Sequence, residues 1–214
     1  MFKKKIFLTL IVILVCVFSV EATKYYISKQ GRLVLDKRVK NRSKGNPKAP
    51  LWVVEYMDFQ CQACKTASEI LKKYMDDHPQ DIYLQVRFYP LVKSHLYAFK
   101  AAIYAECAMK QDKFWPFYDT LFNKQQDWST FEMPDALFRG YAESIGMNTT
   151  ELSACLDDLL TKAAVMEEKD KAVTLGVKST PTFFINGKIV VGGKDLEKEL
   201  SDYFSPKPKD KAPQ

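Results

Sequence analysis

The sequence has few of the side chains that bind transition metals. It holds 2 histidines and 5 cysteines among 214 residues, and Cys61 and Cys64 form its one close-spaced pair of cysteines. A structural zinc site needs four ligands, so this pair alone supplies half of one. The other cysteines and the histidines are scattered singly along the chain. We therefore expect no metal ion, and nothing in the sequence predicts another cofactor.

The chain also lacks a strong excess of charge of one sign. Its 32 basic side chains and 26 acidic ones leave a net charge of +6, and without residues 1–22 the excess falls to +4. That balance is too mild to predict nucleic acid as a partner. The basic residues gather in 28–48, and we interpret residues 23–48 as a basic, solvated lead-in to the domain. A role beside anionic lipid is the alternative.

No hydrophobic run is long enough for an ordinary membrane span. The longest, Ile6–Val20, has 15 residues, whereas a membrane helix needs about 20. Three lysines precede it, and Ala22 follows at a suitable cleavage position. We therefore predict that residues 1–22 are a secretory signal peptide, with a retained single anchor as the alternative. Bulky Val15 disfavours a lipid anchor on Cys16. Each of these places the domain in the periplasm or another extracytoplasmic compartment, where disulfides persist.

The rest of the sequence changes between strand and helix patterns. Trp52–Met57 and 81–91 are rich in β-branched and aromatic residues, which predicts strands. Between them, apolar residues recur at helical spacing. Residues 94 to about 175 have helical character, and Asn186-Gly187 predicts the turn of a hairpin that an amphipathic helix follows.

The expected order is therefore β-α-β, a block of helices, then β-β-α. A strand-helix-strand unit implies a parallel pair, and the hairpin adds antiparallel strands. We predict an α/β domain over 49–204, with a mixed central sheet, helices on its faces and a helical insertion at about 94–175. The final segment, 205–214, is rich in proline and lysine, which is typical of a disordered tail.

The last helix of the insertion is predicted to run from residue 148 to about residue 175. Asn148 and Glu151 have the spacing of a capping box, and Gly176 is a typical helix stop. An apolar stripe is expected along this helix, made of Leu152, Cys155, Leu156, Leu159 and Leu160.

Cys61 and Cys64 lie where the first strand gives way to the first helix. A sulfur at a helix N-terminus is close to free backbone N–H groups and to the positive end of the helix dipole, which stabilise a thiolate. Cys64, one turn later, is expected to face inward. An outer sulfur that forms a mixed disulfide and an inner one that resolves it make a redox pair. An inert disulfide is the alternative, but a helix start suits it poorly.

Three segments resemble the DsbA-like branch of the thioredoxin superfamily: VVEYMDFQCQACK, PLVKSHLYAFKAAIYAECAMKQDKFWPFYDTLF and GVKSTPTFFINGKIVVGG. The resemblance runs from about Gly45 to Phe204. It implies a thioredoxin fold with a helical insertion, and thiol–disulfide chemistry in which Cys61 is the reactive thiol and Cys64 its resolving partner. It also implies that Thr180-Pro181 is a loop with a cis-proline beside the pair, whose backbone is suited to bind an extended substrate strand.

Glu55 lies six residues before Cys61, within an apolar strand. The resemblance implies that it is a buried acid beneath the cysteine pair, where a raised pKa suits it to exchange a proton with Cys64. A glutamate that faces water is the alternative. Asp58 competes for this role, but we expect it to cap the cysteine turn. We expect His95 to pack or cap rather than to catalyse.

One residue departs from the pattern of this branch. Its strongly oxidising members carry a histidine between the two cysteines, whereas this pair encloses Gln62 and Ala63. An uncharged amide stabilises the Cys61 thiolate less than a cation does. Because a less stabilised thiolate makes a less oxidising disulfide, we expect a weaker oxidant than the strongest members.

Cys107 and Cys155 both fall on predicted inward faces of helices in the insertion. Without residues 1–22 the chain keeps four cysteines, and an even count in an exported protein favours two pairs. We therefore predict a structural disulfide between Cys107 and Cys155. Two buried free thiols are the alternative.

Together these features predict a monomeric enzyme that forms disulfide bonds in exported proteins with free cysteines. A membrane partner is expected to reoxidise the cysteine pair. A reductase or isomerase of the same fold is the nearest alternative, but the segment between residue 22 and the first strand is too short for a separate dimerisation domain. The alternative from another class is a periplasmic module that holds copper(I) between Cys61 and Cys64. No cluster of methionine or histidine supports it.

Overall fold

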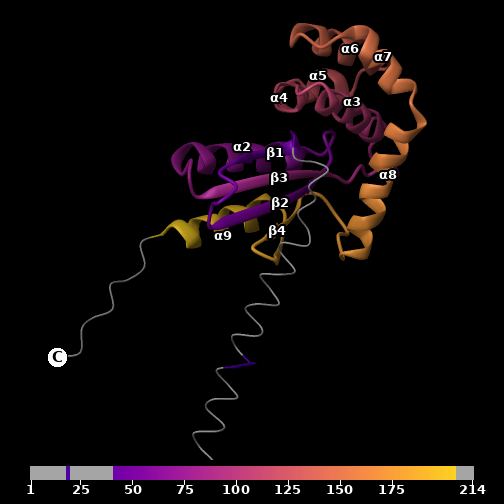
Figure 1. Ribbon diagram of the computed structural model, residues 1–214. Helices are drawn as coiled ribbons and strands as arrows, with labels where there is room; N and C mark the ends of the chain where they lie inside the picture. Colours follow the sequence, from indigo (N-terminus) through magenta and orange to yellow (C-terminus); the bar gives the residue numbers. More distant parts are fainter. Residues whose placement is uncertain (1–17, 20–40, 206–214) are drawn as a thin grey trace, which may run out of the picture.

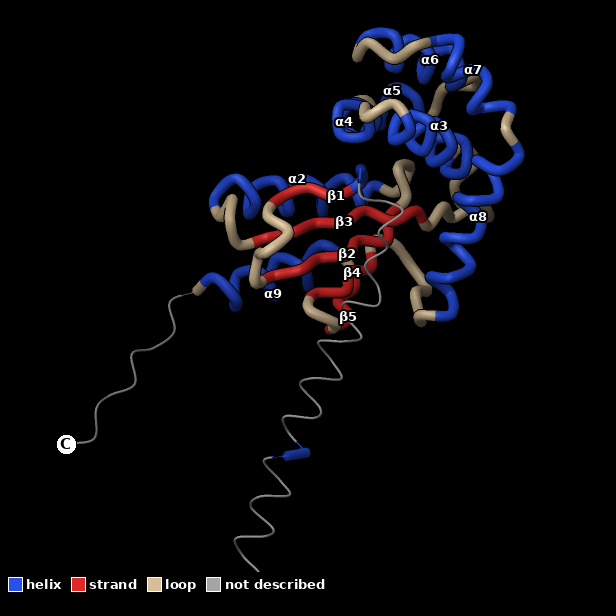
Figure 2. Tube along the Cα trace, viewed as in Figure 1, coloured by secondary structure: helices blue, strands red, loops and turns tan. Residues whose placement is uncertain are grey.

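The computed structural model describes residues 18–19 and 41–205. Its strands are β1 (Ser43–Gly45), β2 (Leu51–Met57), β3 (Ile82–Phe88), β4 (Thr182–Ile185) and β5 (Lys188–Val191). They form one sheet in the order β1-β3-β2-β4-β5 (Figure 1; Figure 2 labels all five strands). β2 and β3 are parallel, and every other neighbouring pair is antiparallel, which confirms the predicted mixed sheet.

The helices lie on the faces of the sheet and beyond one end of it. Within the described residues they are α2 (Gln62–Asp77), α3 (Ala98–Lys110), α4 (Phe114–Asn123), α5 (Gln125–Ser129), α6 (Pro134–Ser144), α7 (Thr149–Asp157), α8 (Leu159–Thr174) and α9 (Gly193–Phe204). α3 to α7 gather beyond the sheet, and α8 leads back to it (Figure 2). This is the predicted order of β-α-β, a helical block and β-β-α.

α2 and α9 cover one face of the sheet. Val53 of β2 and Val86 of β3 belong to the main core together with Leu71 of α2 and Leu200 of α9. A smaller apolar cluster on the other face includes Ala172 of α8. Because side chains alternate along a strand, β2 contributes to both buried layers.

The folded domain begins before the predicted boundary at residue 49. β1 pairs with β3, and just before it Arg42 is buried, with its Nη1 2.8 Å from Oε2 of Glu168 in α8. Residues 41–48 are therefore part of the domain and not of a solvated lead-in. A strand of three residues with the sequence SKG shows no alternation of apolar and polar side chains, so the sequence pattern does not reveal it.

The long helix predicted over 148–175 is two helices, because the chain breaks at Asp158. The Asn148 cap is confirmed, since its side chain accepts two backbone N–H groups at the start of α7. Asp158 is extended, and its carboxylate accepts the N–H of Leu160 at 2.9 Å, which caps α8. Leu159 and Leu160 are 75% and 77% exposed. The prediction that they continue the apolar stripe is wrong, because the break changes the direction of the helix.

Several predictions fall outside the described residues. The signal peptide or anchor at 1–22 lies outside them except for 18–19, as do the lead-in up to residue 40 and the tail from 206 to 214. These assignments stay predictions. Among the helices of the described part, none is both long and apolar enough to cross a membrane.

Candidate active site

Cys61 is the N-cap residue of α2, at the end of a short loop that follows β2. Asp58 shapes this loop. Its Oδ1 accepts the N–H of Gln60 at 2.7 Å, and its Oδ2 accepts the N–H of Leu91 at 2.8 Å. Nδ1 of His95 lies 2.8 Å from the same Oδ2. Asp58 thus holds the cysteine turn, as its position predicts, and His95 packs beside it as a partner of that carboxylate.

The two thiols have unequal surroundings. Both are free cysteines; Cys61 is 9% exposed, whereas Cys64 is fully buried. A hydrogen bond from the Cys64 thiol, with further ones from the backbone N–H groups of Cys64 and Ala63, lowers the pKa of Cys61 to about 5 although burial opposes this. Burial, and then the neighbouring Cys61, raise the pKa of Cys64. At neutral pH, Cys61 is therefore a thiolate and Cys64 a thiol.

The loop before β4 lies against Cys61. Its peptide bond between Thr180 and Pro181 is cis. The carbonyl oxygen of Thr180 lies 3.6 Å from Cys61 Sγ, within reach of a hydrogen bond from Cys61 when that residue is protonated. Pro181 is buried, and its carbonyl oxygen accepts the N–H of Gly192 at 2.9 Å. The residue that follows β5 therefore fixes this loop, which presents the Thr180 backbone to the cysteine.

Glu55 of β2 lies on the face of the sheet that α2 covers. It is fully buried and stands opposite Val86 of β3 and Phe183 of β4, so it does not face water. Burial raises its pKa to about 8, although the Tyr118 hydroxyl donates a hydrogen bond to Oε2 at 3.4 Å. Oε1 has no hydrogen-bond partner among the described residues. After burial and the other cysteine, the charge of Glu55 is a further cause that raises the pKa of Cys64.

Two residues of the insertion contact the site without a signal in the sequence. In the sequence, Tyr118 of α4 has the pattern of an ordinary core aromatic residue, and Gln125 of α5 has that of a polar residue in a helix. The Nε2 of Gln125 donates to the carbonyl oxygens of Phe59 at 2.7 Å and of Cys61 at 3.1 Å. The partners in these three hydrogen bonds are 63 to 66 residues apart in the chain, so no local pattern predicts them.

The site thus combines two sulfurs of different acidity, a buried carboxyl group, a tyrosine hydroxyl and the loop with the cis peptide bond before Pro181. This set is suited to thiol exchange with accompanying proton transfer. Across residues 18–19 and 41–205, no three side chains of histidine, cysteine, aspartate or glutamate gather as a metal site requires.

Known proteins similar to this chain fall into two groups. The Na(+)/H(+) antiporter NhaA 1 of Salinispora arenicola (strain CNS-205) is 34% identical over 154 residues, which are 72% of this chain and 23% of that protein. The chain thus spans about a quarter of the length of the curated relatives it matches. The α-DsbA1 structure of Wolbachia pipientis has a TM-score of 0.67 at 22% identity and covers 81% of this chain and 94% of its own. The thiol-disulfide exchange protein α-DsbA2 of the same organism has a TM-score of 0.66 at 19% identity and covers 85% and 98%.

The family follows from the extent of a further match. Residues 37–202 match the sequence profile of the family described as Thioredoxin, which is well over half of the chain. The match begins before β1, in agreement with the earlier start of the folded domain. The chain therefore belongs to the thioredoxin family and has the fold of the DsbA-type thiol–disulfide oxidoreductases.

Proposed function

We propose that the protein is a thiol–disulfide oxidoreductase that introduces disulfide bonds into exported proteins with free cysteines. The observation that carries this proposal is the difference in acidity between the two thiols at the start of α2. The pKa of Cys61 is lowered to about 5, whereas that of the buried Cys64 is raised. A stabilised Cys61 thiolate favours the reduced form of the pair, so its disulfide is an oxidant. The similar fold of α-DsbA2, a thiol-disulfide exchange protein, supports the same chemistry.

The reaction starts from the Cys61–Cys64 disulfide. A substrate thiolate attacks Cys61 Sγ, the bond to Cys64 breaks, and its electron pair stays on Cys64 Sγ. Glu55 supplies the proton that makes Cys64 a thiol. A second substrate thiolate then attacks the substrate sulfur of the mixed disulfide and releases Cys61 as a thiolate. The substrate loses two electrons, and the cysteine pair gains them.

The loop with Thr180 and Pro181 is the proposed substrate-binding element. An extended substrate segment beside Cys61 pairs with the backbone of Thr180, as in the addition of a strand to a sheet. Pro181 has no N–H, so it offers no donor that competes for the Cys61 thiolate. In this proposal the protein works as a monomer outside the cytoplasm, and a membrane redox partner reoxidises the cysteine pair.

The test follows the oxidation of a reduced peptide with two cysteines by the oxidised full-length protein. We expect stoichiometric oxidation by the wild type and none by Cys61→Ser or Cys64→Ser, neither of which can form the Cys61–Cys64 disulfide. Reduced Cys64→Ser instead forms a mixed disulfide with the oxidised peptide, because it lacks the thiol that resolves this intermediate. Glu143→Ala, an exposed position of α6 in the insertion, is the control and keeps the activity. Exchange by Cys61→Ser contradicts the proposal. Net reduction of the oxidised peptide under the same conditions supports a reductase instead, and stoichiometric retention of copper(I) without exchange supports the metal-binding alternative.

A further inference from the structure

The proposed reaction moves a proton at a place that water does not reach directly. Glu55 and Cys64 are both fully buried. In the reduced protein the pKa of Glu55 is about 8, so at neutral pH the carboxylate takes up a new proton after it has given its own to Cys64. The neighbours of Glu55 across the sheet, Val86 and Phe183, are apolar and carry no proton.

Tyr118 is the side chain that connects Glu55 to the insertion. Its hydroxyl donates to Glu55 Oε2 at 3.4 Å. Burial is the main cause that raises the pKa of Tyr118, and the charges of Glu55 and Cys64 add to it, whereas a hydrogen bond from Ser68 lowers it. The hydroxyl therefore stays neutral at neutral pH, and it has Glu55 on one side and Ser68 on the other.

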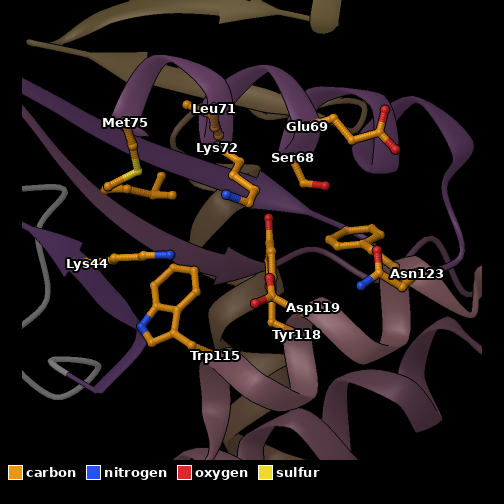
Figure 3. A pocket seen from close by; sticks show the side chains of 12 residues that line it. Lys44, Ser68, Glu69, Leu71, Lys72, Met75, Trp115, Tyr118, Asp119 and Asn123 are labelled. Carbon is orange, nitrogen blue, oxygen red and sulfur yellow. The ribbon is translucent and has the colours of Figure 1, made fainter. Parts of the chain in front are cut away.

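A pocket lies on the far side of Tyr118, between α2, α4 and β1. Its volume is about 190 Å³, well above the roughly 10–15 Å³ that one water molecule needs. Figure 3 shows the tip of Tyr118 and the Ser68 hydroxyl both directed into the space between the two helices. Lys72 and Asp119 also line the pocket and are exposed, so it is open to solvent.

We propose that Tyr118 is a positioning residue that relays protons between Glu55 and this pocket, an inference that rests on the proposed function. When Glu55 protonates Cys64, the Tyr118 hydroxyl gives its proton to Glu55 Oε2. It takes another from water in the pocket, directly or through the Ser68 hydroxyl. Tyr118 is neutral before and after, so the net change is one proton moved from the pocket to Cys64. Removal of the proton from Cys64 during reoxidation uses the same path in reverse.

Charged groups face this path from each element around it. Cys61, the N-cap of α2, and Cys64 within that helix lie on the Glu55 side. Glu69 and Lys72 of α2, Lys44 of β1 and Asp119 of α4 line the pocket. Burial raises the pKa of Asp119, while Lys44 and Lys72 lower it. Both signs of charge are thus present at the pocket, which makes it a suitable place to exchange protons with solvent.

The test is Tyr118→Phe in the full-length protein, which removes one oxygen atom and keeps the ring. The rate at which a small dithiol reduces the Cys61–Cys64 disulfide is measured against pH in a single turnover. We expect the rate of reduction to fall about tenfold in Tyr118→Phe. Loss of a general acid or base itself typically slows a reaction by at least roughly 100-fold. The expected effect is smaller because Glu55 is still present. The carboxyl group of Glu55 is titrated in parallel by infrared spectroscopy, with Glu55→Gln as the blank. Its midpoint moves above about 8 in Tyr118→Phe, because the hydrogen bond that lowers it is lost.

Tyr104→Phe is the matched control. Tyr104 is also a buried tyrosine, but its hydroxyl donates to Asp135 at 3.1 Å within the insertion, so we expect neither the rate nor the titration of Glu55 to change. If Tyr118→Phe does not fold, Ser68→Ala tests the same path from the side of the pocket, because Ser68 is only half-buried. We expect a smaller fall in the rate of reduction than for Tyr118→Phe. Ser68→Thr, which keeps a hydroxyl group, is expected to recover the rate.

Two outcomes separate the relay from the function. A wild-type rate in Tyr118→Phe, with an unchanged pH profile and Glu55 midpoint, overturns the relay and leaves the proposed function standing. Failure of the wild-type protein to exchange disulfides at all overturns the proposed function, while the infrared titration still reports whether Tyr118 acts on Glu55.

Discussion

Gln125 of α5 donates a hydrogen bond to the carbonyl oxygen of Cys61, the residue that caps α2. The same Nε2 donates to the carbonyl oxygen of Phe59. One buried amide of the insertion therefore fixes both sides of Gln60 in the loop that carries the reactive sulfur. The insertion therefore helps to set the backbone conformation of the cysteine turn.

Gln125→Ala is predicted to loosen this turn. It leaves the buried carbonyl oxygen of Phe59 without the donor that it now has, and such a loss costs about 1–3 kcal/mol of stability. Urea denaturation of the variant measures this. Glu143→Ala, an exposed position of α6, is the control, and we expect it to change stability by less than about 0.5 kcal/mol. Equal stability of the two variants argues against a structural role for the Gln125 amide.

Glu55→Gln is predicted to change how the stability of the reduced protein depends on pH. Folded Glu55 has a pKa of about 8, compared with 4.5 for an ordinary glutamate. Between these values the folded state holds a proton that the unfolded state has lost, so the contribution of Glu55 to stability is full below about pH 4.5 and is lost as the pH rises through 8.

Glutamine does not titrate, so the stability of Glu55→Gln rises relative to that of the wild type as the pH rises. The gain between pH 4 and pH 9 is on the order of 4 kcal/mol. Denaturation curves of both reduced proteins at the two pH values give this difference, and the titration of Cys61 cancels between them. A difference that does not vary with pH shows instead that Glu55 has the same pKa in the folded and the unfolded protein.

The reduced protein is predicted to contain one cysteine that ionises near pH 5. Hydrogen bonds from Cys64 and from the start of α2 lower the pKa of Cys61 to about 5, so the ultraviolet absorbance of a thiolate appears around that pH. Cys61→Ser abolishes the transition, whereas Cys107→Ala with Cys155→Ala leaves it in place. A midpoint at the ordinary cysteine value of about 8.5 contradicts the geometry described for the pair.

The structure joins Cys107 and Cys155 in a disulfide, and we predict that this disulfide acts on stability alone. It closes a sequence separation of 48 residues between α3 and α7, and a cross-link of this kind contributes about 2–4 kcal/mol. The double variant Cys107→Ala with Cys155→Ala loses that amount in urea denaturation. Its Cys61–Cys64 pair keeps the wild-type reduction potential, and a changed potential shows instead that this disulfide takes part in the exchange.

The sequence predicts the parts of the fold whose residues repeat with a clear period. β2, α2, β3 and the hairpin of β4 and β5 agree with it, because alternation, helical spacing and an Asn-Gly turn are local signals. The sequence misses β1, which is only three residues long, and the break at Asp158, where a single side chain caps a new helix.

The candidate site likewise has residues whose positions the sequence predicts and residues whose roles it does not. The start of a helix after a strand is visible in the sequence, so the position of Cys61 can be predicted. The burial of Glu55 depends on neighbours from β3 and β4, and the roles of Tyr118 and Gln125 depend on hydrogen bonds to residues far away in the chain. Tertiary packing decides such contacts, and one sequence carries no local mark of them.

The reduction potential of the Cys61–Cys64 pair, measured by equilibration of the full-length protein with glutathione buffers, tests the central claim most directly. The lowered pKa of Cys61 stabilises the reduced pair, while the uncharged Gln62 limits that stabilisation. We predict a value between about −120 and −180 mV, in the range of oxidants and exchange catalysts. A value near −270 mV, roughly that of thioredoxin, contradicts the account and makes the protein a reductase.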